Sequence, residues 1–402
     1  MSFLARGSRN SFVDPARGPQ GLLAKLMALN WALMVVLTAV ASIGFLLLYG
    51  AADGALDPWA RPQMVRFGVG FAVMLIIGLI HIRVWRALAP LAYLGALALL
   101  VLVEFFGTVG MGAQRWISVG PIQIQPSEMM KVAVVMALAS YYAWLDPEKV
   151  SRPLWIVPPL LLILVPTGLV LIQPNLGTAI LLVAGGGTVL FLAGVSLWYF
   201  AAALAAVTGA VTAVLKSHGT PWQLLHDYQY RRIFTFLDPD NDPLGAGYHI
   251  SQAKIAMGSG GLTGRGFMQG TQSRLNFLPE RHTDFIFTSL AEDFGFVGAL
   301  GLLILLTLVV VFCTFSAISN RDRFGALLTG GIAMIFFLFF AVNMGMVMGM
   351  MPVVGVPLPL VSYGGSSMLV LMAAFGLAQS AHVHRPVRGT GRWARDFASD
   401  AT

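Results

Sequence analysis

The chain has 402 residues, of which 57% are hydrophobic and only 11% are charged. A soluble domain carries about a quarter charged residues, so this composition excludes a soluble protein and indicates an integral membrane protein. The net charge is +7, but the basic residues gather in the tails and in short loops between apolar runs. Membrane topology explains that distribution, and we expect no binding of nucleic acid. The apolar runs lack strand alternation, so the predicted fold is an all-α, polytopic helical bundle.

Ten apolar runs along the chain are each long enough to cross a membrane as a helix of about 20 residues. The first run follows basic residues and contains an A-x-A motif, but it is too long for a cleaved signal peptide, so we expect it to remain as a helix. We expect part of the eighth run to lie outside the bilayer. The predicted spans are about 28–49, 64–82, 87–106, 127–145, 154–172, 176–194, 197–215, 284–315, 324–350 and 366–382.

The distribution of lysine and arginine predicts the orientation of these spans. Both tails and one set of loops hold most of the basic residues, whereas the opposite short loops hold few. We therefore expect a single membrane domain (1–402) with cytoplasmic tails at 1–27 and 383–402 and a large extracytoplasmic loop at 216–283. Within that loop, 250–257 is typical of a short amphipathic helix.

A polar stretch at 265–287 runs directly into the eighth span and places Asp284 at the boundary. Two interpretations are open at this position. Thr283 or Asp284 caps the helix that follows, or Asp284 acts as a general base or a metal ligand at the membrane surface. We interpret His282 as a structural residue.

Charged residues also occur at the start of the fourth span. Glu128 and Lys131 lie three residues apart and share one helix face. At membrane depth such residues favour a functional site, and the alternative is a structural ion pair behind Ser127 as N-cap. In the preceding loop, Arg115 and Trp116 either anchor the chain at the interface or bind a phosphate and a sugar.

Two stretches rich in glycine suggest different roles. The segment 351–367 has three prolines and three glycines, which exclude a regular helix. At this depth it must be buried in protein or line a cavity, so it is either a re-entrant plug or a wall of the active site. The segment 258–266 lacks the strand, the helix and the Lys-Ser/Thr ending of a P-loop, which argues against nucleotide binding.

Five blocks of sequence, from the first span to the tenth, resemble the SEDS family of peptidoglycan glycosyltransferases (FtsW/RodA/SpoVE). The block GTQSRLNFLPERHTDF resembles the RodA, or elongation, branch, whereas the division branch tends to read YLPEAHTDF. Asn175 stands where the family usually has Asp. The blocks are GAQRWISVGPIQIQPSEMMK at 112–131, IQPNLGTA at 172–179, HDYQYRRIFTFLDPDNDPLGAGYHISQAKIAMGSGGLTGRG at 226–266, GTQSRLNFLPERHTDFIF at 270–287 and MPVVGVPLPLVSYGGSS at 351–367.

The resemblance implies polymerisation of lipid II into β-1,4 glycan strands, with inversion at the sugar and departure of undecaprenyl pyrophosphate. It places Asp284 at the family's catalytic position, as the base. Arg115, Lys131, Arg232 and Lys254 become candidates to hold the pyrophosphate. The predicted substrate-binding residues are Arg115, Trp116, Glu128, Lys131, Arg232, Lys254, Ser362 and Ser366.

The resemblance also implies a setting and partners. We expect the bacterial cytoplasmic (inner) membrane, a class B penicillin-binding protein of the elongation type as partner, and a divalent cation, Mg²⁺ or Mn²⁺, as the cofactor to test. No ligand set for that cation is visible in the sequence. The alternatives are a lipid II flippase, a scaffold that only holds a transpeptidase, and a division-type paralogue with the same chemistry.

Overall fold

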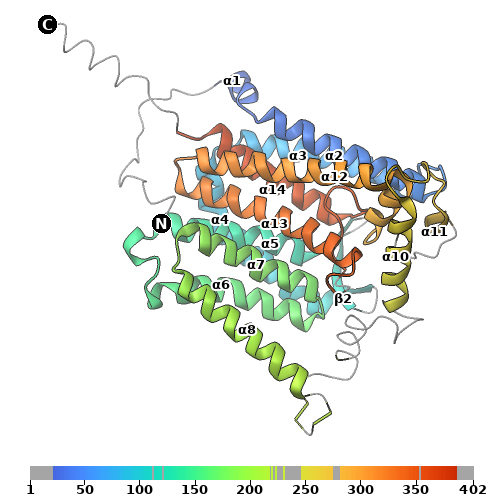
Figure 1. Cartoon of the computed structure of the whole chain (residues 1–402). Helices are drawn as coiled ribbons and strands as arrows, with labels where there is room; N and C mark the ends of the chain where they lie inside the picture. Colours follow the sequence, from blue (N-terminus) through green and yellow to red (C-terminus); the bar gives the residue numbers. More distant parts are fainter. Residues whose placement is uncertain are drawn as a thin grey trace, which may run out of the picture.

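The computed structural model is a bundle of long helices with a small sheet at one end (Figure 1). The structure describes residues 21–110, 113–119, 122–217, 219–220, 222–223, 230, 246–274, 281–352 and 355–386. Within these ranges all ten predicted spans are helical, which confirms the all-α bundle. The ten helices are α2 (Trp31–Ala51), α3 (Ala60–Leu79), α4 (Ile82–Phe106), α5 (Pro126–Trp144), α6 (Pro153–Ile172), α7 (Leu176–Ala193), α8 (Leu197–Ser217), α12 (Ile286–Ser319), α13 (Arg323–Val347) and α14 (Ser366–Val383).

Among the described residues, nine of these helices are long and apolar enough to cross a membrane. The tenth, α5, carries the charged pair Glu128 and Lys131. Three short helices also occur, α1 (Leu22–Met27), α10 (Ala246–Gly260) and α11 (Thr271–Arg274), together with a 3-10 turn, η1 (Pro147–Lys149). The helix expected at 250–257 lies within α10. Most of the predicted tails and residues 231–245 of the predicted large loop lie outside the described residues.

A three-stranded antiparallel sheet follows α4, in a segment that the sequence predicted to be a loop. Its strands are β1 (Thr108–Gly110), β2 (Ala113–Val119) and β3 (Ile122–Ile124), in the order β1-β2-β3. Figure 1 shows β2 at the same end of the bundle as α10 and α11. We call this the sheet end.

The centre of the bundle is formed by α13 and α14. In each of them 72% of the most apolar stretch is buried, whereas no residue of α8 is buried and α8 slants away from the other helices (Figure 1). Glycine allows α14 to pack closely on α3, because a Cβ on Gly376 would lie only 2.8 Å from the Cβ of Ile77. Small residues at such crossings permit close backbone packing between membrane helices.

The long helix α12 is interrupted at Gly295, whose φ of 66° and ψ of −162° are not helical. The backbone groups released by this kink bond to the glycine-rich segment 261–266 instead. Arg265 N donates to Glu292 O at 3.0 Å and Gly266 N to Asp293 O at 3.0 Å, while Phe296 N donates to Gly261 O at 2.9 Å. The glycine-rich segment therefore holds the kink, in a setting unlike that of a P-loop.

Candidate active site

Asp284 lies in the turn 281–285 directly before α12, at the sheet end. The N-cap of α12 is Phe285, which makes no side-chain capping bond. Of the two interpretations left open, the one in which Thr283 or Asp284 is the N-cap is therefore wrong, because the helix begins one residue later. The side chain of Asp284 is partly exposed, as a group that meets a substrate must be.

Asn343 of α13 fixes the backbone beside this carboxylate. Its side chain is fully buried, and its Nδ2 donates to Asp284 O at 2.9 Å and to Val356 O at 2.7 Å. Gly355, with a φ of +64°, precedes Val356, and a Cβ there would lie 3.6 Å from Oδ2 of Asp284. One amide group thus holds the turn that carries Asp284 against the loop 355–365.

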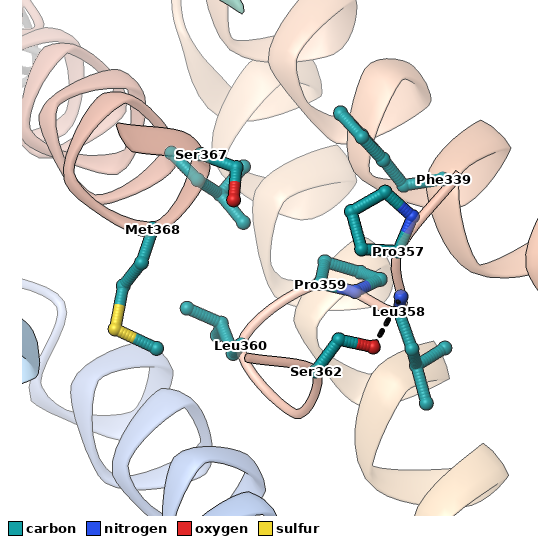
Figure 2. A pocket seen from close by; sticks show the side chains of 9 residues that line it. Phe339, Pro357, Leu358, Pro359, Leu360, Ser362, Ser367 and Met368 are labelled. Atoms are coloured by element: carbon teal, nitrogen blue, oxygen red, sulfur yellow. Dashed lines mark hydrogen bonds between the residues drawn. The ribbon is translucent and has the colours of Figure 1, made fainter. Parts of the chain in front are cut away.

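Ser362 makes a second tie between this loop and the turn. Its Oγ accepts from Leu358 N at 2.8 Å, as Figure 2 shows, and donates to Thr283 O at 2.6 Å. The backbone adds a third tie, because Tyr363 N donates to His282 O at 2.9 Å. The predicted substrate-binding role of Ser362 is untested, and the geometry shows its hydroxyl engaged in positioning the approach to Asp284.

His282 packs within a cluster of rings, in agreement with its interpretation as a structural residue. Its ring stacks on Trp59 at a centroid distance of 3.9 Å and lies 6.2 Å from the ring of Tyr363. Next to it, Arg281 forms an ion pair with Asp53 at 3.5 Å. These contacts attach the turn before α12 to the segment between α2 and α3.

Glu128 and Lys131 form a buried ion pair, as their spacing predicted. Lys131 Nζ lies 2.7 Å from Glu128 Oε1, and the two residues are only 2% and 7% exposed. The ammonium also lies 4.0 Å from the ring centre of Phe339. The predicted N-cap at Ser127 is wrong, because α5 begins at Pro126 and Gln125 occupies that position.

Two small cavities lie beside this pair and beneath the loop, each with a volume of about 20 Å³, which is room for about one water molecule. Figure 2 shows the first, lined by Ser362, Pro357 and Ser367 among others. Glu128 and Lys131 line the second, and Phe339 and Ser367 line both. The ion pair and the loop are thus neighbours around the start of α14.

Ser366 links two helix starts. It is the first residue of α14, it is 4% exposed, and its Oγ accepts from Gln125 N at 3.3 Å. The start of α14 is therefore tied to the start of α5. The predicted contact of Ser366 with substrate stays a prediction.

Arg115 and Trp116 lie on β2. Arg115 donates from Nε to Gln173 O at 3.0 Å and from Nη2 to Pro174 O at 2.5 Å. Trp116 pairs with Thr108 across the sheet. The guanidinium that we expected to hold a pyrophosphate is thus bound to the turn between α6 and α7.

The remaining predicted residues are spread more widely. Lys254 is exposed on α10, and Arg232 lies outside the described residues. Among the described residues, no three His, Cys, Asp or Glu side chains come together as a group that can hold a metal ion. The core of the site is therefore the turn 281–285, the loop 355–365 and the pair on α5.

Comparison with known proteins decides the family. The model of the FtsW/RodA/SpoVE family, described as a cell cycle protein, matches residues 22–386. The chain belongs to the FtsW/RodA/SpoVE family. It is 43% identical over 365 residues to the peptidoglycan glycosyltransferase MrdB of Escherichia coli K12, covering 89% of this chain and 94% of MrdB. It is 33% identical over 355 residues to a probable peptidoglycan glycosyltransferase FtsW of Idiomarina loihiensis, covering 86% and 85% of the two chains.

Solved structures of the family share the fold. A peptidoglycan synthase complex, described as coordinating polymerization and crosslinking, contains a chain that matches with a TM-score of 0.76 and 33% identity, over 89% of this chain and 99% of that one. The rod shape determining protein RodA of Thermus thermophilus matches with a TM-score of 0.65 and 30% identity, over 90% and 99%. The predicted SEDS membership and its elongation branch are confirmed.

The departure of this FtsW/RodA/SpoVE protein from the family pattern at Asn175 now has a structural account. Asn175 is the N-cap of α7, its side chain accepts from Thr178 N at 3.3 Å, and it is 7% exposed. An Asn side chain caps a helix as well as Asp does. The turn that it shapes is the one that Arg115 binds.

Two residues of this site were missed in the sequence. Asn343 was hidden within an apolar run, although an amide inside a predicted span was itself a signal, since buried polar groups need partners. Gln63, near the start of α3 and just before the predicted second span, was also missed. It is fully buried, and its Nε2 donates to Ser362 O at 2.9 Å.

Proposed function

We propose that this protein is a peptidoglycan glycosyltransferase that polymerises lipid II into β-1,4 glycan strands during cell elongation. The observation that carries the proposal is the position of Asp284, a partly exposed carboxylate at the end of a membrane helix, held by Asn343 and by the loop 355–365. The identity of 43% with MrdB over nearly the whole chain supports it.

In the proposed reaction Asp284 acts as the general base. The donor sugar is α-linked to a lipid pyrophosphate and the product is β-linked, so the acceptor hydroxyl displaces the pyrophosphate in one step. The carboxylate takes the proton of that hydroxyl as the new bond forms. Positive charge near the departing pyrophosphate stabilises it, which removes the need for a general acid.

Two of the cations expected for this task are already bound to other groups of the protein. Lys131 is paired with Glu128, and Arg115 bonds to two backbone carbonyls. We include Mg²⁺ or Mn²⁺ in the proposal, because such an ion is commonly held by one or two carboxylates together with substrate phosphates. The described residues hold no cluster of His, Cys, Asp or Glu ready for it, so the ion would be held mainly by the substrate phosphates, whose charge it would offset.

The proposed setting is the bacterial cytoplasmic membrane, with both tails in the cytoplasm and the sheet end outside. The basic residues of the tails and loops support this orientation. The proposed partner is a class B penicillin-binding protein of the elongation type, which would cross-link the strands. The likeness to a chain of a synthase complex that coordinates polymerization and crosslinking supports that partner.

The test is polymerisation of fluorescent lipid II by the purified full-length protein, with and without the cognate penicillin-binding protein. Wild type and Asp284→Asn are run side by side, with moenomycin present to silence contaminating polymerases of the other class. Glycan ladders from wild type alone support the proposal. Ladders from both proteins would show that Asp284 is not the base. Ladders from neither protein would favour a flippase or a scaffold.

A further inference from the structure

Arg66 lies on α3, at the sheet end, and has no role in the site described above. Its guanidinium covers the ring of Tyr363, with Cζ 4.7 Å from the ring centre. Its Nη1 is buried from solvent and has no hydrogen-bond acceptor within the described part of the chain. A buried donor without a partner costs free energy, more so when it is charged, and buried donors are normally paired with protein, ordered water or a bound group.

Arg66 also lacks a carboxylate partner among the described residues, none of which forms an ion pair with it. By contrast, Lys131 has Glu128 at 2.7 Å, and Arg61, five residues earlier on α3, has Asp57 at 3.6 Å. Arg115 donates to two carbonyls instead. Of these four cations, Arg66 is the one that forms neither an ion pair nor a hydrogen bond with a side chain or carbonyl in the described ranges.

The neighbourhood of Arg66 adds to the attraction for an anion. A Cβ on Gly365, the N-cap of α14, would lie 4.0 Å from Cζ of Arg66, so the guanidinium lies beside the start of that helix. Gly365 provides no side-chain cap. The start of a helix carries partial positive charge and favours phosphate groups, so the helix and the guanidinium act in the same direction.

A short path joins Arg66 to the turn that carries Asp284. Tyr363, which Arg66 covers, donates its backbone N–H to His282 O at 2.9 Å. Gln63, one turn before Arg66 on α3, donates to Ser362 O at 2.9 Å and accepts from Gly364 N at 3.4 Å. Arg66 is therefore held rigidly against the loop that positions the proposed base.

From this geometry we infer that Arg66 binds a phosphate group of a lipid-linked substrate. The inference rests on the proposed function and deepens it, since it assigns the phosphate to a cation outside the predicted set. Arginine suits the position because its planar fork binds phosphate through two N–H groups while its face stacks on an aromatic ring. Lysine would keep the charge but lose the fork and the stacking.

The experiment measures binding of fluorescent lipid II to the purified full-length protein in detergent. The variants are Arg66→Gln, Arg66→Lys and, as a matched control, Arg61→Gln, whose side chain is 72% exposed on the same helix. A charge-assisted bond to phosphate predicts that Arg66→Gln weakens binding by about tenfold or more. Arg66→Lys is expected to fall between that variant and wild type, and Arg61→Gln to bind as wild type does.

Two further measurements make the outcome decisive. Melting temperatures identify a variant that loses binding because it is unfolded. If Arg66→Gln is unfolded, binding by Arg66→Lys is compared with wild type instead. Competition with phosphatidylglycerol tests whether the bound phosphate belongs to the substrate or to a membrane lipid. If lipid II stays bound in a large excess of phosphatidylglycerol, the assignment to the substrate is supported. If equal concentrations of phosphatidylglycerol displace lipid II, that assignment is overturned. Unchanged binding by folded Arg66→Gln and Arg66→Lys overturns the inference altogether.

The inference and the proposed function can fail separately. If wild type binds lipid II through Arg66 but forms no glycan, the anion site stands and the polymerase proposal fails. If wild type polymerises while both Arg66 variants bind and polymerise as wild type does, the polymerase proposal stands and the inference fails.

Discussion

The side-chain amide of Asn343 donates to the backbone carbonyl of Asp284 at 2.9 Å. The same nitrogen donates to Val356 O at 2.7 Å, so one buried group sets the distance between the turn before α12 and the loop 355–365. The side chain of Asn343 is fully buried. It acts through Asp284, as a positioning residue.

Replacing Asn343 with Ala is expected to lower kcat for lipid II polymerisation by about 10- to 100-fold with little change in KM, because the carboxylate loses its fixed position. The free energy of unfolding should also fall by about 1–3 kcal/mol, because two backbone carbonyls lose their donor. Asn320→Ala is the matched control. Asn320 is also buried and donates to Ala381 O at 3.0 Å, but it follows the other end of α12.

The two variants separate stability from catalysis. Asn320→Ala should lower the melting temperature of the protein in detergent and leave kcat of the folded fraction unchanged. An equal loss of kcat in both variants would contradict a positioning role for Asn343 and would indicate general destabilisation.

The pair of Glu128 and Lys131 predicts a strongly non-additive effect. Lys131→Met leaves a buried carboxylate without its partner, and breaking such a pair costs about 3–5 kcal/mol. The double change Glu128→Gln with Lys131→Met should recover much of that loss, because neither charge remains. Melting temperatures of both single variants and the double variant measure the coupling.

Activity of the double variant then decides the role of the pair. If the ammonium contacts substrate, the double variant folds but polymerises poorly. Restored polymerisation would instead show that the pair is structural, which is the alternative that the sequence left open.

The spans and the ion pair could be predicted because they depend on local pattern. Apolar runs of sufficient length predict membrane helices, and a spacing of three residues on a helix predicts the contact of Glu128 with Lys131. The position of Asp284 at a boundary was visible for the same reason. Each of these features involves residues close together in the chain.

The sheet was missed although its signal was present. The residues 115–119 and 122–124 are two short runs rich in β-branched and aromatic residues, separated by Gly120 and Pro121, which is the pattern of a hairpin. The glycines of this segment led us to predict a loop instead. The contacts of Arg115 with Gln173 and of Asn343 with Asp284 join residues 58 and 59 positions apart, and no local pattern indicates them.

The glycine-rich segment 258–266 offers a matched pair of substitutions. At Gly264 a Cβ would overlap the carbonyl oxygen of Asp293, whereas at Gly261 nothing lies within 4 Å. Both residues have positive φ, +83° and +57°, so each Ala carries the left-handed penalty of about 1–2 kcal/mol. Only Gly264→Ala should also detach the segment from the kink at Gly295.

We therefore expect Gly264→Ala to lower the melting temperature more than Gly261→Ala does and to expose the segment 261–274 to protease. Limited proteolysis of the folded protein in detergent checks this. Equal cleavage of the two variants would contradict the view that the segment is held by the backbone of α12.

Asn175 allows the departure from the family pattern to be tested directly. Asn175→Asp keeps an N-cap acceptor for Thr178 N and places a negative charge beside the turn that Arg115 binds. Since Asp and Asn cap helices about equally well, we expect the variant to match or exceed wild type in melting temperature and to polymerise lipid II normally. Asn175→Ala removes the cap and should cost about 1 kcal/mol of stability. A large rise in kcat for Asn175→Asp would contradict the structural account, because it would mean that a charge at this position takes part in the reaction.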